Sequence, residues 1–187
     1  SITLTTKDLT KGFDFEPGLH VALSYIQDGQ STYEGGFLYL WDWESTKTRT
    51  SDTSSLVVPF QDPTFAQDFY LASEVQAYYR SQFYTAELNY WKVFSDSRNS
   101  LVSFSGVGGV RFAHLREKFS LTTVENHLAG EYDISTKNDL IGVQIGFLFQ
   151  LNAVKYWHWD LEGKVGVGLN RISSDSYLSD QNNTVEL

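Results

Sequence analysis

Apolar and polar residues alternate along residues 140–152. One set of alternate positions is apolar throughout: Ile141, Val143, Ile145, Phe147, Phe149 and Leu151. Most positions between them carry glycine or glutamine: Gly142, Gln144, Gly146 and Gln150. A period of two is typical of a β-strand with one face against an apolar environment and the other against water. We therefore predict a long amphipathic strand here.

The following segment repeats this pattern with charged residues. Its apolar positions are Trp157, Trp159, Leu161, Val165, Val167 and Leu169, and its polar ones are His158, Asp160, Glu162, Lys164 and Asn170. Charged side chains at every second position are too costly to bury in a dry core, so this face should meet water.

Four earlier segments have the same period, including one in which Phe37, Tyr39, Trp41 and Trp43 share a face. We predict strands near 18–27, 33–44, 77–94, 101–121, 131–152 and 156–171. A transmembrane β-strand needs about 9–11 residues. The predicted fold class is therefore all-β, an antiparallel transmembrane β-barrel built as an up-and-down meander, with residues 1–187 as a single domain.

The predicted connections alternate between short and long. Short polar turns lie at 27–31, with the turn pair Asp28-Gly29, at 95–99 and at 152–155, and long outer loops lie at 45–76, 122–138 and 172–187. Outer-membrane barrels keep short turns on the periplasmic side and long loops outside. A soluble antiparallel sandwich would also alternate, but it has no reason to sort its loops by length.

The strand count is lower than a closed barrel requires. Single-chain bacterial barrels start at about eight strands, and we identify six, with residues 1–6 as a remnant of another and residues 173–187 as a polar loop. We therefore expect part of a larger barrel, or a chain whose missing strands come from another copy.

Composition narrows the function classes. The net charge of -9 disfavours nucleic acid as a partner, and the absence of cysteine excludes disulfides and thiolate sites. Aromatic residues make up 16% of the chain, and we predict an interfacial girdle of Trp41, Trp43, Tyr90, Trp157 and Trp159. The expected partners are outer-membrane lipid and either further copies of the chain or other envelope proteins, with no cofactor and no metal.

Seven polar residues fall on faces predicted to line a lumen at similar depths: Glu87, Asn89, Arg111, Gln144, Asp160, Glu162 and Lys164. Two interpretations stay open at this point. The charges could set ion selectivity in a water-filled pore, or they could form a salt-bridged network that fills a narrow barrel and blocks conduction.

Other motifs favour structural roles. Glycines at 106, 108, 109, 163, 166 and 168 lie inside strands, where they indicate curvature or close approach by a large neighbour, rather than a phosphate loop. His114, His127 and His158 with Asp133, Asp139 and Asp160 lack a metal-binding spacing, and we predict no enzyme activity. The acidic stretch 122–139 lacks calcium-loop spacing. The apolar segment 56–60 could enter the barrel mouth, contact a neighbouring subunit or be buried within its own loop.

Five stretches in order carry a family resemblance. They are DFEPG (14–18), TAELNYW (85–91), GVRF (109–112) continuing to EKFSL (117–121), NDLIGVQIG (138–146) and DLEGKVG (160–166). Together they resemble the outer-membrane β-barrel porin family number seven of planctomycete-type bacteria and, more distantly, the pore-forming major outer-membrane proteins of Legionella type. The resemblance implies a porin-like barrel in the bacterial outer membrane.

We therefore predict passive diffusion of small solutes or ions through a polar lumen. The alternative from another class is a structural or interaction barrel that anchors surface loops or an envelope layer without conduction. A third hypothesis, a soluble β-sandwich binding protein, requires a second sheet over the apolar face of residues 140–152.

Overall fold

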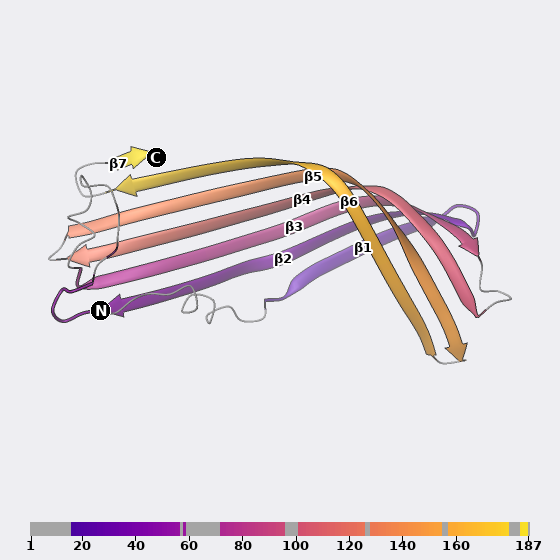
Figure 1. Ribbon diagram of the computed structural model, residues 1–187, viewed down its shortest axis with the longest axis horizontal. Helices are drawn as coiled ribbons and strands as arrows, with labels where there is room; N and C mark the ends of the chain where they lie inside the picture. Colours follow the sequence, from indigo (N-terminus) through magenta and orange to yellow (C-terminus); the bar gives the residue numbers. More distant parts are fainter. Residues whose placement is uncertain are drawn as a thin grey trace.

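In the part of the chain that the structure describes, six long β-strands and a short seventh form one antiparallel sheet. The computed structural model describes residues 16–56, 58, 72–95, 101–125, 128–154, 157–179 and 184–186. The strands are β1 (Gly18–Ile26), β2 (Ser31–Thr50), β3 (Glu74–Ser95), β4 (Val102–Glu125), β5 (Leu128–Val154), β6 (Trp157–Ser179) and β7 (Thr184–Glu186). Each pairs with the next along the chain (Figure 1). The predicted all-β antiparallel meander is therefore confirmed, whereas the sheet is open and not closed into a barrel.

The described residues contain no helix that could span a membrane.

The predicted loop boundaries were wrong at the end of the sheet that holds the connection 51–73. β4 and β5 continue as a hairpin through most of 122–138, and β6 continues to Ser179 with β7 beyond it, so 172–187 is not simply a loop. Similarly, β2 and β3 take up the ends of the predicted loop 45–76. Among the described strands, only 51–73 is a long connection, and the predicted regular sorting of loops by length is not observed. The proposed strand at residues 1–6 lies outside the described residues.

The turn between β1 and β2 follows the prediction from Asp28-Gly29. Gly29 has a φ of 71°, and the Gln27 amide donates to the Ser31 carbonyl at 2.9 Å. The Asp28 carboxylate accepts hydrogen bonds from the amides of Gln30 (3.0 Å) and Ser31 (2.6 Å). The bond from Gln30 is the main reason why the pKa of Asp28 lies below its ordinary value. The side chain thus satisfies turn amides that the sheet leaves free.

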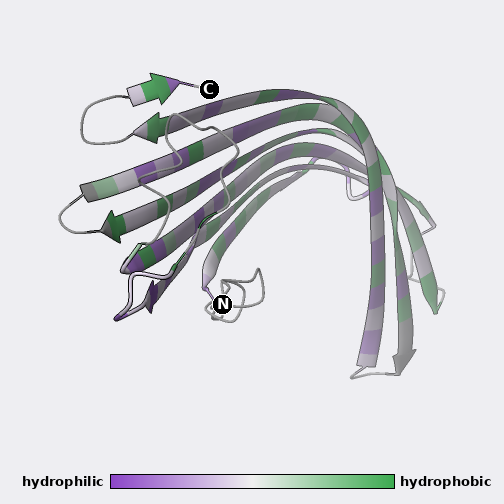
Figure 2. Cartoon of the chain, turned by 60° about the vertical axis from the view of Figure 1, so that its left-hand side comes forward, coloured by the Kyte–Doolittle hydropathy of each residue, from purple (hydrophilic) through white to green (hydrophobic). Residues whose placement is uncertain are grey.

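One face of the sheet is apolar across all six long strands; we call it the convex face. The register aligns its residues in rows across the sheet, such as Val21, Phe37, Ala86, Phe112, Ile141 and Leu169. The next row contains Leu23, Gly35, Leu88, Val110, Val143 and Val167. Many of these side chains are exposed, with Ile141 at 63% and Val167 at 76%. Figure 2 shows the apolar residues alternating with polar ones along the strands.

The sheet bends toward its other face, the concave face, because glycines there leave room for the neighbouring backbone (Figures 1 and 2). A Cβ atom on Gly142 would lie 2.5 Å from the Val167 carbonyl oxygen, and one on Gly168 would lie 2.6 Å from that of Ile141. On the convex face, a Cβ atom on Gly108 would meet no atom within 4 Å. This asymmetry supports curvature as the role of the concave-face glycines Gly142 and Gly168, but not of Gly108. The large neighbours over Gly106 and Gly163 are phenylalanines, Phe94 and Phe147.

A bulge in β2 moves Trp43 to the concave face. The pairing of β2 with β3 shifts between Leu40 and Trp43, so Trp43 lies opposite Ser81. Trp41 stays on the convex face, where its ring lies 5.8 Å from that of Tyr39. The prediction that both tryptophans share a face was therefore wrong, because an added residue in a bulge breaks the period of two.

Beyond the bulge the polarity of the two faces is exchanged. The concave face there holds a small core of Leu56, Ala72, Val75, Ala77 and Leu121. Leu56 and Ala72 form an isolated β-bridge, so the start of the 51–73 connection packs on the sheet. Leu56 is therefore not buried within its own loop alone, and residues 57, 59 and 60 lie outside the described residues. The convex face at this end carries charged pairs, including Lys118 with Asp133 at 3.1 Å.

The glycine asymmetry leads to a first prediction. Gly142→Ala should lower the free energy of unfolding by about 1–3 kcal/mol, because its methyl group forces β5 and β6 apart. The matched change Gly108→Ala should stay within about 0.5 kcal/mol of the wild type. Urea unfolding of both variants in detergent micelles measures the difference. Equal losses of stability in the two variants would contradict the proposed role of Gly142.

Candidate functional site

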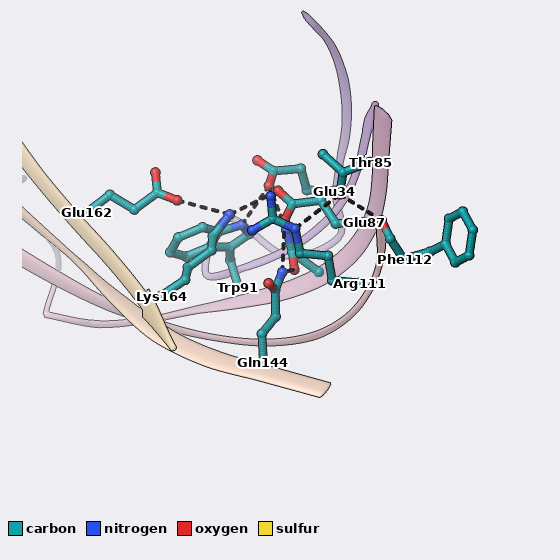
Figure 3. Close-up of polar contacts among 10 residues, drawn as sticks. Glu34, Thr85, Glu87, Trp91, Arg111, Phe112, Gln144, Glu162 and Lys164 are labelled. Carbon is teal, nitrogen blue, oxygen red and sulfur yellow. Dashed lines mark hydrogen bonds and ion pairs between the residues drawn. The ribbon is translucent and has the colours of Figure 1, made fainter. Parts of the chain in front are cut away.

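Polar side chains from five strands meet on the concave face around Glu87 of β3 and Lys164 of β6 (Figure 3). The Lys164 Nζ atom lies 3.1 Å from Glu87 Oε1 and 2.9 Å from Glu162 Oε1. It also lies 5.3 Å from the ring centroid of Trp91, as in a cation–π contact. The side chains of Lys164 and Glu87 are only 17% and 19% exposed. Their charges are therefore largely withdrawn from water, and each needs the other.

The Glu87–Lys164 ion pair joins strands that are not neighbours. β4 and β5 lie between β3 and β6 in the sheet, and three strand spacings of about 4.8 Å amount to about 14 Å on a flat sheet. The two long side chains reach toward each other over these strands, and curvature of the sheet toward the concave face shortens the distance that they span. On the two strands between them, Gly109 of β4 and Gly142 and Gly146 of β5 lie on this face and add no side chains to block the pair.

Gln144 connects the ion pair to a second group of acceptors. Its Nε2 atom donates to Glu87 Oε2 at 2.9 Å and to Asn89 Oδ1 at 2.7 Å. Asn89 Nδ2 in turn donates to Glu34 Oε1 at 3.1 Å, and Trp91 Nε1 donates to the same oxygen at 3.3 Å. Gln144 and Asn89 are both buried. The network thus couples β2, β3, β5 and β6 through side chains.

Arg111 lies directly opposite Glu87 in the pairing of β3 with β4. Its Nε atom donates to Thr85 Oγ1 at 3.0 Å, and Thr85 Oγ1 donates to the Phe112 carbonyl oxygen at 2.7 Å. Arg111 is thus positioned next to the carboxylate of the central ion pair and adds a second cation to this face.

The structure brings most of the predicted lining residues together. Glu87, Asn89, Gln144, Glu162 and Lys164 belong to one network, and Arg111 flanks it. Asp160 lies nearer the turn between β5 and β6 and accepts a hydrogen bond from Gln150 at 3.3 Å. Sequence reasoning missed Glu34 and Trp91. Trp91 could have been found, because it shares the odd-numbered positions of β3 with Glu87 and Asn89.

The two histidine candidates that the structure describes lie on opposite faces of the sheet. His114 is on the convex face, where its Nδ1 lies 2.6 Å from Asp139 Oδ1 and its ring stacks on Tyr84. His158 is exposed on β6, and His127 lies outside the described residues. The residues that the structure describes contain no group of three or more potential metal ligands. The acidic residues of the stretch 122–139 belong to strands, Glu125 to β4 and the others to β5, and Asp133 pairs with Lys118.

Aromatic side chains lie toward the edges of the apolar part of the convex face. The Tyr90 ring lies 5.2 Å from that of Tyr33, and its hydroxyl donates to Ser31 Oγ at 3.2 Å. Trp157 and Trp159 are each 66% exposed. Trp41 lies on the same face as these residues, whereas Trp43 lies on the concave face.

Comparisons with protein families, with curated proteins and with solved structures found no match. The resemblance to the porin family therefore stays a prediction.

The central ion pair leads to a second prediction. In a double-mutant cycle of Glu87→Gln and Lys164→Gln, the coupling energy should be about 1–3 kcal/mol, because each single change leaves a mostly buried partner without its counter-charge. Urea unfolding of the wild type, the two single variants and the double variant provides the cycle. Effects that add within about 0.5 kcal/mol would show that the two side chains do not depend on each other.

Proposed function

We propose that this sheet is part of the wall of a β-barrel in the bacterial outer membrane and that the barrel carries out porin-like passive diffusion. The observation that carries the proposal is that the convex face is apolar over the same stretch of all six long strands, whereas the opposite face holds the network of charged and amide side chains. On β5, the convex face is apolar over the eleven positions from Ile141 through Leu151. This length matches the roughly 9–11 residues with which a tilted strand crosses a bilayer.

The exposure of the convex face supports lipid as its environment. A contiguous apolar surface of this kind is rare on soluble monomers. A soluble sandwich would cover it with a second sheet, but all strands among the described residues belong to one sheet. In a bilayer, acyl chains cover this face and the sheet pairs the backbone polar groups internally. The free edges of β1 and β6 are paired with further strands in the proposed barrel.

The long strands extend past the apolar part of the convex face at one end only. At the other end, β1 and β2, β3 and β4, and β5 and β6 turn directly beside it. The extended end carries ion pairs on the convex face, such as Lys118–Asp133, and an apolar core on the concave face. We assign the extended end to the cell surface, because outer-membrane barrels carry their larger loops there.

The charged side chains on the concave face support the proposal of porin-like diffusion. Small solutes or ions would pass along Glu87, Arg111 and Lys164 without a cofactor or a covalent step, and the fixed charges would set ion preference through their local field. The order of motifs that resembles the porin family points in the same direction.

A second candidate function is a non-conducting barrel that anchors surface elements. The specific observation in its favour is the Glu87–Lys164 ion pair with its partners Gln144 and Glu162. Paired charges that reach across three strand spacings draw the wall inward, and in a narrow barrel the interior is filled by side chains.

Conductance separates these two candidates and provides a third prediction. The purified, folded protein in a planar bilayer should show stable open steps, and Arg111→Gln should shift the ion preference toward cations because it removes a positive charge from the lining. Lys47→Gln, at the extended end of the concave face, is the matched single-charge control and should shift it less. Absence of conductance from folded, inserted protein would favour the anchoring function instead.

A fourth prediction concerns the environment of the convex face. Val143→Lys should destabilise the folded, lipid-inserted protein by about 2–4 kcal/mol, since it places a charge near the bilayer midplane. Thr122→Lys, on the same face beyond the apolar part, should have little effect. Folding into phosphatidylcholine vesicles at graded urea concentrations measures both. Val143 is already 58% exposed, so a sheet that faces water would tolerate the lysine, and a negligible effect would contradict the membrane assignment.

A further inference from the structure

Four cationic side chains gather on the convex face just beyond its apolar part. Arg116 and Lys137 lie opposite each other in the pairing of β4 with β5, and Arg80 and Lys118 lie opposite each other in the pairing of β3 with β4. They alternate with concave-face residues and therefore share the face of Phe112 and Ile141. We call Arg80, Arg116, Lys118 and Lys137 the cationic cluster. It stands out in a chain whose net charge is -9.

The cationic cluster follows the aromatic edge of the apolar surface. Tyr84 and His114 occupy the position between Phe112 and Arg116 along the sheet. Gln82, opposite Arg116, donates a hydrogen bond to the Tyr39 hydroxyl at 2.9 Å. Along the convex face, apolar residues therefore give way to aromatic residues and then to cations. In the wall of a membrane barrel, this order of residue types matches the order of the bilayer layers: acyl chains, interface and headgroups.

Within the part of the chain that the structure describes, two members of the cationic cluster have counter-charges and two do not. Arg80 pairs with Asp42 and Glu44, and Lys118 pairs with Asp133. Arg116 and Lys137 form no ion pair with another residue that the structure describes. Like charges directly opposite each other in an antiparallel pair are destabilising. An external anion beside Arg116 and Lys137 would therefore best offset the repulsion between these two cations.

A small cavity of about 110 Å³ marks the place where such an anion would bind. It is lined by Arg80, Gln82, Arg116 and Lys118. All four side chains can donate hydrogen bonds, and no carboxylate lines the cavity. A guanidinium group matches the oxygen geometry of a phosphate with two parallel hydrogen bonds.

We propose that the cationic cluster binds the phosphate group of a membrane lipid headgroup. The inference rests on the proposed membrane location. A lipid is the favoured source because the cluster borders the apolar surface: a phosphate held at Arg116 leaves its acyl chains over Phe112 and Ile141. The convex position also separates this site from the polar network on the concave face.

Lipid binding to the full chain in detergent micelles tests the proposal by native mass spectrometry. The probes are phosphatidic acid, phosphatidylcholine with the same acyl chains, and inorganic phosphate. The wild type should prefer phosphatidic acid, and the double variant Arg116→Gln with Lys137→Gln should bind it about tenfold more weakly, as expected for loss of charge-assisted hydrogen bonds. The matched control, Lys47→Gln with Arg49→Gln, removes one lysine and one arginine from the concave face and should bind as the wild type does.

The outcomes separate this inference from the proposed function. Equal phosphatidic acid affinity in the wild type and the Arg116/Lys137 double variant would overturn the site. Inorganic phosphate that binds as tightly as the lipid would overturn the assignment to a headgroup. Flotation of the same proteins with phosphatidylcholine vesicles tests membrane insertion independently. Insertion without a preference for phosphatidic acid removes the lipid site alone, whereas failure of the wild type to insert removes the proposed function as well.

Discussion

The close approach of β5 and β6 on the concave face determines the shape on which the polar network depends. Gly142 and Gly168 allow it, because a Cβ atom at either position would press against a carbonyl oxygen of the opposite strand. The resulting curvature brings Lys164 within 3.1 Å of Glu87 although two strands lie between them. The ion pair then stabilises the same curvature, since separating the two mostly buried charges is costly. The close packing of β5 and β6 and the Glu87–Lys164 ion pair therefore favour the same curvature of the sheet.

Much of this sheet could be predicted from its sequence, because a strand has only two faces. The alternation along β5 and β6 identified both strands and assigned Gln144 and Lys164 to the polar face. Two kinds of error have physical causes. Trp43 was misassigned because a single bulge reverses the faces beyond it. The hairpin within 122–138 was taken for a loop because the convex face becomes polar there, as Glu131 and Asp133 illustrate.

The candidate site was predictable as a set of residues but not as a set of contacts. Shared faces and neighbouring registers placed Glu87, Arg111 and Gln144 at similar depths, as the pairing of β3, β4 and β5 shows. Alternation carries no information on curvature, however, so it could not predict the contact between Glu87 and Lys164. The alternation also could not predict that the two faces exchange polarity at the extended end of the sheet. Leu56 becomes part of a core only because its segment packs on the sheet next to Ala72 and Val75.

The central claim is that odd-numbered positions of β5 face lipid while even-numbered ones face a polar interior. The chain contains no cysteine, so single cysteines at successive positions from 139 to 151 can each carry one nitroxide label. Power-saturation measurements in phosphatidylcholine vesicles then compare collisions with oxygen and with a water-soluble nickel complex. Oxygen should dominate at the odd positions from 141 to 149, whereas the even positions should not show this excess. Odd positions shielded from both reagents, or as open to nickel as the even ones, would contradict the account.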